Sequence, residues 1–208
     1  MYATFGKRTL DIIGAAVLLV LALVPMAIIA IVIRLTSEGP ALFRQKRYGQ
    51  DKKPFTVYKF RSMAVHAPSD RATSDFHDSH AYITGLGKIM RKLSIDELPQ
   101  LLNVLKGDMS FVGPRPLILK EKSVIDLREK LNANSVRPGI TGWAQANGRD
   151  EIDDVEKAEL DGYYVENFGI KMDIHCLIKT IWVIVSVAGH SEGHECAAKN
   201  NDKMAARE

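Results

Sequence analysis

The 208-residue sequence has few cysteines, little net charge and none of the common short catalytic motifs. Cys176 and Cys196 are too few for a disulfide framework, and no Cys-x-x-Cys pair is present to hold a structural zinc, so a reducing, cytosol-facing environment is expected. The 28 basic residues nearly balance the 25 acidic ones, which argues against a dedicated nucleic-acid-binding protein. Walker, G-x-G-x-x-G, G-x-S-x-G and H-E-x-x-H motifs are missing, which argues against the enzyme classes that depend on them.

The longest uncharged apolar stretch covers the 22 residues 12–33. As one straight helix it would measure about 33 Å, roughly the thickness of the hydrocarbon core of a bilayer. Pro25 lies near its middle, where the missing donor and the proline ring predict a bend. Basic residues flank the stretch on both sides, with eight of them in residues 34–61, so the positive-inside rule favours the cytoplasmic side for both ends. A straight span and a helix that turns back at Pro25 are both open at this point.

The rest of the chain has no comparable apolar run and predicts one globular unit on the membrane surface. Short strands are expected at residues 41–43 and 55–60, and a short helix at 87–92. Residues 64–80 are polar and rich in turn formers, which is typical of a surface loop. Residues 170–188 are mostly apolar but interrupted by charges, which favours an interfacial or core helix over a membrane span.

A further helix is expected to begin near Asp96 and to end at Gly107. Asp96 as the N-cap residue would place Pro99 in the first turn, where its missing N–H does least harm. The alternative is Ser94 as the N-cap with Glu97 three residues later, in the pattern of a capping box. In either case the acidic residues serve the helix, and capping alone would explain them.

The same two carboxylates also suit phosphoryl-transfer chemistry, because a helix N-terminus attracts anions and adjacent carboxylates can hold Mg²⁺ beside a phosphate. Lys59, Arg91 and Arg115 would neutralise a diphosphate while one carboxylate attacks phosphorus. Residues 107–149 form turns rich in glycine and proline that carry three arginines, each able to grip a phosphate with two donors. Residues 150–166 are rich in acidic residues, which predicts a solvated helix face with room for one functional carboxylate.

Two long ordered motifs carry a resemblance to a known family. The run KIMRKLSIDELPQLLNVLKGDMSFVGPRPL, followed by VRPGITGWAQANGR, resembles the small monotopic phosphoglycosyl transferases of the bacterial sugar transferase family. Further similarity lies in the opening KRTLDIIGAAVLLVLALVPMAIIAI and in the YKFRSM and LDGYYVENFGIKMDI segments. The resemblance therefore covers nearly the whole chain.

The resemblance implies the transfer of a sugar 1-phosphate from a UDP-sugar to undecaprenyl phosphate or another polyprenyl phosphate, with release of UMP. Asp96 matches the family's nucleophile, which forms a covalent phosphosugar intermediate, and the neighbouring Glu97 would support Mg²⁺. The same dyad would therefore hold the metal. Downstream glycosyltransferases would act on the product, and no nucleic-acid partner is expected.

The family also supplies expectations for the residues that bind phosphate or substrate. Arg91 matches an arginine upstream of the dyad and should hold a phosphate, and Arg137 is a candidate on the nucleotide side. The full set of expected phosphate- and substrate-binding residues is Lys59, Arg91, Arg115, Arg137, Arg149, Asp161 and Asp173.

The implied fold class is α/β and mostly helical, a compact membrane-associated catalytic domain with amphipathic interfacial helices. Residues 1–36 would form a re-entrant membrane helix broken at Pro25, residues 37–189 the catalytic domain on the cytosolic face of the bacterial inner membrane, and residues 190–208 a flexible tail. Relatives often place a serine before that proline, whereas Val24 stands here. We expect the minimal form of the enzyme, without an added membrane domain.

The sugar and two rival functions stay open at the level of sequence. An N-acetylated amino sugar is our first expectation, and a hexose such as glucose or galactose is the alternative. A membrane-anchored nucleotide-sugar hydrolase would use the same dyad with water as acceptor. A non-catalytic scaffold would use the dyad only to cap a helix.

Overall fold

The computed structural model describes residues 2–67, 79–148 and 152–187 and is mostly helical, with two small sheets of two strands each. The predicted class, mostly helical with some strand, is confirmed in this coarse form. In chain order the elements are a π-helical turn (Tyr2–Gly6), α1 (Lys7–Thr36), β1 (Leu42–Tyr48), a 3₁₀ turn (Gln50–Lys52), β2 (Pro54–Phe60), α2 (Ser79–Tyr82), α3 (Gly85–Lys92), the 3₁₀ helix η4 (Ile95–Gln100), α4 (Leu101–Lys106), β3 (Ser110–Val112), α5 (Lys122–Lys130), β4 (Gly139–Thr141), α6 (Trp143–Asn147), α7 (Asp154–Glu166) and α8 (Ile170–Val187).

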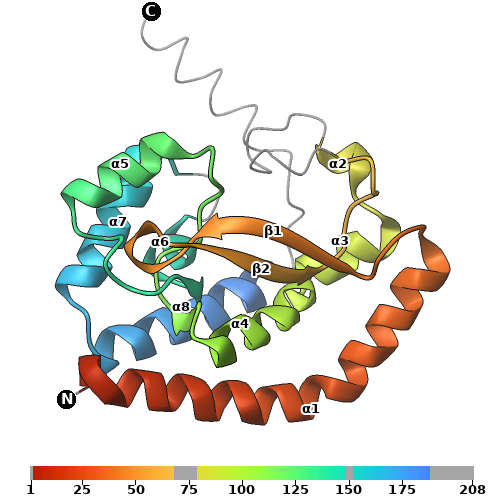
Figure 1. Ribbon diagram of the computed structural model, residues 1–208, viewed down its shortest axis with the longest axis horizontal. Helices are drawn as coiled ribbons and strands as arrows, with labels where there is room; N and C mark the ends of the chain where they lie inside the picture. Colours follow the sequence, from red (N-terminus) through yellow and green to blue (C-terminus); the bar gives the residue numbers. More distant parts are fainter. Residues whose placement is uncertain (1, 68–78, 149–151, 188–208) are drawn as a thin grey trace, which may run out of the picture.

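The β1–β2 hairpin crosses the middle of the molecule, α1 runs along one side, and α5 and α7 lie at one end (Figure 1). The hairpin is antiparallel, with Leu42 opposite Phe60 and Tyr48 opposite Pro54. Both predicted strands are present, but β1 is longer than expected because its charged residues alternate with residues that pack. The second sheet pairs β3 with β4 in parallel.

Within the parts of the chain that the structure describes, α1 is the one helix long and apolar enough to cross a membrane. Most of its large apolar side chains are exposed, including Val20 at 75% and Leu35 at 81%. A core helix of a soluble protein would bury this surface, because exposed apolar area costs about 25 cal/mol per Å² in water. The helix is therefore compatible with membrane association.

Pro25 lies inside α1, and helical backbone continues through it. The helix changes direction along its length (Figure 1), as expected where a proline removes one hydrogen bond and presses on the preceding turn. The predicted break is thus a bend within one continuous helix. The path of this helix into and out of a bilayer stays a prediction.

The polar N-terminal end of α1 is fastened to the rest of the domain. The guanidinium of Arg8 donates to the carbonyl oxygens of Val104 at 2.6 Å and Leu105 at 2.9 Å, where it satisfies carbonyls at the C-terminal end of α4. One carboxylate oxygen of Asp11 accepts a hydrogen bond from the Ser110 hydroxyl at 3.1 Å. These contacts fix the apolar helix α1 against α4 and β3, next to the candidate site.

The helix predicted from Asp96 begins differently in the structure. The first turn is the 3₁₀ helix η4, and only after it does the chain continue as α4, which ends as predicted at Gly107 with a positive φ of 92°. Ser94 stands at the N-cap position of η4 with a left-handed backbone, but its side chain makes no cap hydrogen bond. Asp96 is therefore not the N-cap, because it lies inside the first turn. The alternative position, Ser94, is confirmed, but its capping box does not form, since the Glu97 carboxylate pairs with Lys59 instead.

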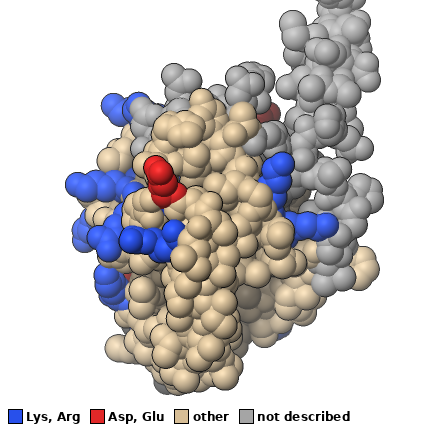
Figure 2. Space-filling view, turned by 90° about the vertical axis from the view of Figure 1, so that its right-hand side faces the viewer, with Lys and Arg blue, Asp and Glu red and all other residues tan. Residues whose placement is uncertain are grey.

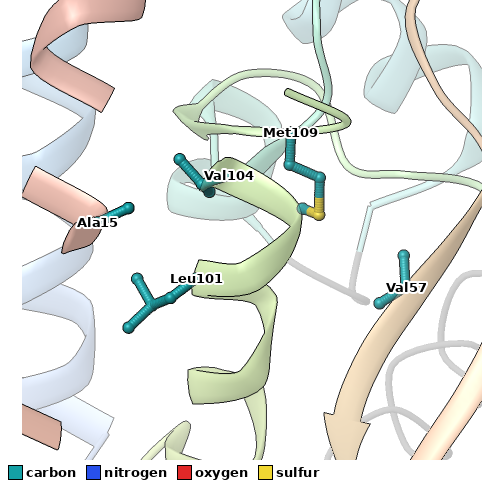
Figure 3. Packing of buried hydrophobic residues seen from close by; sticks show 5 residues of the cluster. All are labelled: Ala15, Val57, Leu101, Val104 and Met109. Atoms are coloured by element: carbon teal, nitrogen blue, oxygen red, sulfur yellow. The ribbon is translucent and has the colours of Figure 1, made fainter. Parts of the chain in front are cut away.

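A hydrophobic core lies between α1, α4 and β2. Its buried residues are Ala15, Val57, Leu101, Val104 and Met109, each at most 3% exposed. Figure 3 shows α4 between the other two elements, with Ala15 on one side and Val57 on the other. Burial of large aliphatic side chains contributes about 1.5–3 kcal/mol each, so this cluster sets the spacing of the three elements that border the site.

Candidate active site

A single large cavity of about 950 Å³ brings the predicted dyad together with three of the predicted basic residues. It is lined by residues from α1, the hairpin, α3, η4 and α8 and from the segments that follow β2 and β3. The predicted residues on its wall are Lys59, Arg91, Asp96, Glu97 and Arg115. Four different segments of the chain supply them, so only the folded protein places them side by side.

Lys59 reaches the dyad because a buried asparagine holds β2 against α4. Asn103 is fully buried; its side-chain nitrogen donates to the Thr56 carbonyl at 2.7 Å, and its oxygen accepts from the Tyr58 backbone N–H at 3.1 Å. These contacts fix the strand immediately before Lys59, whose ammonium donates to Glu97 Oε1 at 2.5 Å. The two charged side chains keep only 22% and 25% of their surface exposed, so the pair is screened by little water.

Asp96 and Glu97 are neighbours in sequence but differ in their electrostatics. Burial raises the pKa of Asp96, and the nearby charges of Lys59 and Arg91 only partly offset this effect. Burial acts on Glu97 in the same direction, but Lys59 and Arg115 outweigh it, so the pKa of Glu97 is lowered. Glu97 is held as an anion, whereas Asp96 is the more basic and less stabilised carboxylate, as suits a nucleophile.

The cavity is also lined by three arginines that the sequence does not mark as site residues. They are Arg44, Arg47 and Arg61. Arg47 is held in place by neutral acceptors, the Pro116 carbonyl at 2.7 Å and Gln45 Oε1 at 2.9 Å. Burial, together with the charge of Arg115, lowers the pKa of Arg47 to about 10. Cations grouped along one cavity wall are stabilised by a polyanion, and a diphosphate has the required charge.

Another part of the cavity wall is apolar. Leu18, Leu21 and Ala22 of α1 and Val183 and Ile184 of α8 border the same volume. A cavity lined both by cations and by the membrane-type helix suits an amphiphilic ligand with an anionic head and an apolar chain.

The outer face beside α3 and the end of α1 carries lysine and arginine side chains at its edges and few acidic ones (Figure 2). Anionic lipid headgroups attract such basic patches near a membrane-associated helix. This face therefore fits the expected position of the domain on a membrane surface.

The sequence profile of the family described as bacterial sugar transferase matches residues 2–187 of the chain. The chain belongs to the bacterial sugar transferase family. The match includes the dyad, the hairpin and both apolar helices, and so every described element around the cavity of this transferase.

Individual relatives are similar over most of the transferase chain. The "Uncharacterized sugar transferase EpsL" of Bacillus subtilis is 40% identical over 193 residues, which cover 93% of this chain and 94% of that protein. The UDP-N-acetylgalactosamine-undecaprenyl-phosphate N-acetylgalactosaminephosphotransferase of Aeromonas hydrophila is 40% identical over 89% of this chain, but that match is 45% of its own length. The UDP-glucose:undecaprenyl-phosphate glucose-1-phosphate transferase of Escherichia coli is 40% identical over 85% of this chain and 39% of its own length. The chain thus spans nearly all of the first relative and less than half of the other two.

Asp161 does not line the cavity of the transferase. It supports the cavity wall indirectly, through Arg128. It is fully buried in α7 and pairs with the guanidinium of Arg128, which is 4% exposed and donates to the backbone carbonyl of Arg115 at 2.9 Å. Asp161 and Arg128 therefore hold the loop that carries Arg115. The sequence interpretation of residues 150–166 as a solvated face did not foresee this buried pair, although aspartate in the middle of a helix beside buried Gly162 and Tyr164 hints at it.

The cavity wall does not include two further predicted residues, Asp173 and Arg137. The Asp173 carboxylate pairs with Lys7 at 2.5 Å and accepts a hydrogen bond from the Tyr164 hydroxyl at 2.7 Å, so it fastens α8 to α1 and α7. Arg137 donates to the Gly107 carbonyl at 2.9 Å. Arg149 lies outside the described residues. Substrate contacts of these three residues stay predictions.

Asp161→Asn is expected to cost about 3–5 kcal/mol of unfolding free energy, because it leaves the buried Arg128 without its counter-charge. Glu159→Gln, an exposed change on the same helix, should cost less than about 0.5 kcal/mol. Chemical denaturation in detergent would measure both. Equal small losses for the two variants would show that the pair does not support the fold.

Proposed function

We propose that the chain transfers a sugar 1-phosphate from a UDP-sugar to a polyprenyl phosphate at the cytosolic face of the bacterial inner membrane. One observation carries this reading: the cavity joins a carboxylate dyad and several cations to a wall formed by the membrane-type helix α1. Two relatives are named for the transfer of sugar phosphates to undecaprenyl phosphate. A water acceptor, unlike a polyprenyl phosphate, has no apolar chain to occupy that wall.

The proposed reaction has two steps. In the first, an Asp96 carboxylate oxygen attacks the phosphorus bonded to the sugar, and the bond from that phosphorus to the bridging oxygen breaks, so that UMP leaves with the electron pair. In the second, a phosphate oxygen of the polyprenyl phosphate attacks the same phosphorus and releases the Asp96 carboxylate. The cations around Glu97 stabilise negative charge in both steps, and the product is a polyprenyl diphosphate sugar for downstream glycosyltransferases.

The dyad also fits a magnesium ion. Mg²⁺ is commonly bound by one or two carboxylates together with substrate phosphates and water, and Asp96 and Glu97 both line the cavity. No group of three or more potential metal ligands exists in the part of the chain that the structure describes, so the remaining ligands would come from substrate and water. When bound, the ion would neutralise the diphosphate and aid the departure of UMP.

The donor is proposed to be a UDP-linked N-acetylated amino sugar, with a UDP-hexose as the alternative. The side-chain oxygen of Gln145, on the cavity wall, is buried without a hydrogen-bond partner. An acetamido N–H would satisfy it. A sugar hydroxyl is the competing donor, so turnover has to decide between the two classes.

The test is nucleotide release from a panel of UDP-sugars by purified protein in detergent, with Mg²⁺ and undecaprenyl phosphate. We expect UMP from one donor or a few related donors, and no UMP above background from the rest. UDP as the product would mean ordinary glycosyl transfer, and UMP release at full rate with water as the only acceptor would favour the hydrolase.

Removal of divalent metal with EDTA is expected to lower UMP release by at least about a hundredfold, since a diphosphate would then face the carboxylate dyad with less neutralisation. Added Mg²⁺ should restore it, whereas added Na⁺ at equal ionic strength should not. Activity that survives exhaustive chelation would remove the metal from the proposal.

A further inference from the structure

Arg61 is a buried cation on the cavity wall, and none of the acidic residues that the structure describes forms a salt bridge with it. It is 7% exposed, and one guanidinium nitrogen donates to Ser37, to the carbonyl at 3.0 Å and the hydroxyl at 2.7 Å. Its Nε and Nη1 atoms are buried without any hydrogen-bond partner. A buried guanidinium with two unused donors is costly unless an anion binds there.

The backbone directs Arg61 toward the same side as Lys59. Arg61 continues the hairpin ladder, since its N–H donates to the Ala41 carbonyl at 2.8 Å, and residues two apart in a strand share a face. Lys59 is neutralised by Glu97, whereas the hydrogen bonds that Arg61 donates go to neutral groups of Ser37. The two cations are therefore not equivalent.

Two groups of cations act on the dyad. Lys59 acts electrostatically on both Asp96 and Glu97, and Arg115 and Arg47 act on Glu97. Arg91 acts on Asp96 and donates to the Ser62 hydroxyl at 2.9 Å, next in sequence to Arg61. Because Asp96 would take the phosphosugar from one phosphate and pass it to another, each of the two phosphates needs cations of its own.

Arg61 lies beside the C-terminal end of α1. Its partner Ser37 is the C-cap residue of α1, and the charge of Arg34, in the last turn of α1, acts on the Arg61 guanidinium. An anion at Arg61 would thus lie beside the end of the helix that also supplies the apolar wall. A ligand whose phosphate carries an apolar chain can occupy both places at once.

We propose that Arg61 binds the phosphate monoester of the lipid acceptor, while the Lys59, Arg115 and Arg47 group binds the diphosphate of the donor. This assignment rests on the proposed function and adds to it a separate acceptor subsite. Arg61 has no part in attack by Asp96; it places the incoming phosphate oxygen for the second step.

The first test measures binding without turnover. Farnesyl phosphate and farnesol are titrated into the detergent-solubilised wild type, Arg61→Gln and Lys46→Gln, a matched change at an exposed basic residue of the same hairpin. We expect the wild type and Lys46→Gln to prefer the phosphate, and Arg61→Gln to bind farnesyl phosphate at least about tenfold more weakly with farnesol unchanged. An unchanged preference, or an equal loss for farnesol, would overturn the assignment. Full competition by inorganic phosphate at equal concentration would also overturn it, since the site would then not select a lipid phosphate.

The second test separates the two substrates in turnover. In Arg61→Gln the KM for polyprenyl phosphate is expected to rise at least about tenfold, while the KM for the UDP-sugar changes less than about twofold. If Arg61→Gln does not fold, Arg61→Lys carries both tests, because an ammonium cannot offer the same fork of donors and a three- to tenfold loss is expected. A rise in the donor KM alone, or no change, contradicts the proposal. If the wild type binds farnesyl phosphate selectively but shows no turnover, the proposed function is rejected. The anion site at Arg61 is then still supported.

Discussion

Asp96→Asn is expected to reduce UMP release by about a thousandfold or more, because an amide cannot form the covalent intermediate. The melting temperature should stay the same or rise slightly. Burial raises the pKa of Asp96 above its ordinary value, which means that ionising this carboxyl costs more free energy in the folded protein than in the unfolded chain. Asparagine keeps the shape and removes that cost. Nucleotide release and thermal unfolding of the two proteins, purified in parallel, measure both effects.

The same pair of measurements separates catalysis from helix capping. If the Asp96 charge only stabilised the start of η4, its removal would lower the melting temperature slightly and leave any turnover in proportion to the folded protein. Ser94→Ala is a suitable control, because the Ser94 side chain makes no cap hydrogen bond and its loss should change stability little. Turnover that survives in Asp96→Asn would end the covalent mechanism.

Lys59→Met is expected to lower kcat by about a hundred- to a thousandfold, as does removal of a preorganised charge contact in other active sites. Lys59 lies 2.5 Å from Glu97 and acts on Asp96, so its loss changes the charge balance of the whole dyad. Glu97→Gln should have an effect of similar size. Steady-state kinetics of both single variants give these values.

The double variant shows whether the two residues act as one unit. We expect Lys59→Met combined with Glu97→Gln to be less impaired than the product of the single effects, because either change alone leaves a partner charge unbalanced. Lys53→Met, an exposed change at the hairpin turn, is the control and should keep wild-type kinetics. Strictly multiplicative effects would show that Lys59 and Glu97 act independently.

Local sequence patterns predicted many of the elements but not the contacts between them. The hairpin, α3 and the stop at Gly107 follow from β-branched and aromatic runs, a helix-forming segment and a glycine. The expected start near Asp96 agrees with η4, but the expected capping by its acidic residues is wrong, because their partners lie outside their own helix. Their partners, Lys59 above all, come from a strand almost forty positions earlier, and local rules do not include such pairs.

The sequence predicts the part of the site that consists of motif residues. The predicted residues Lys59, Arg91 and Arg115 line the same cavity as the dyad. Arg61 is not distinguished by the sequence, because it is one of eight basic residues in the segment that follows the apolar stretch. Its importance depends on burial and on unused donors, which are properties of packing. Asp161 was selected through resemblance, but its contact with Arg128 requires the pairing of α5 with α7, which no periodicity encodes.

The covalent role of Asp96 is tested most directly by the intact mass of the protein after incubation with its UDP-sugar in the absence of acceptor. We expect a mass increase equal to one sugar phosphate, located at Asp96 by peptide mapping, absent in Asp96→Asn and lost when polyprenyl phosphate is added. UMP formation that requires the acceptor, with no adduct on the protein, would mean direct transfer between the two substrates and would contradict the covalent role of Asp96.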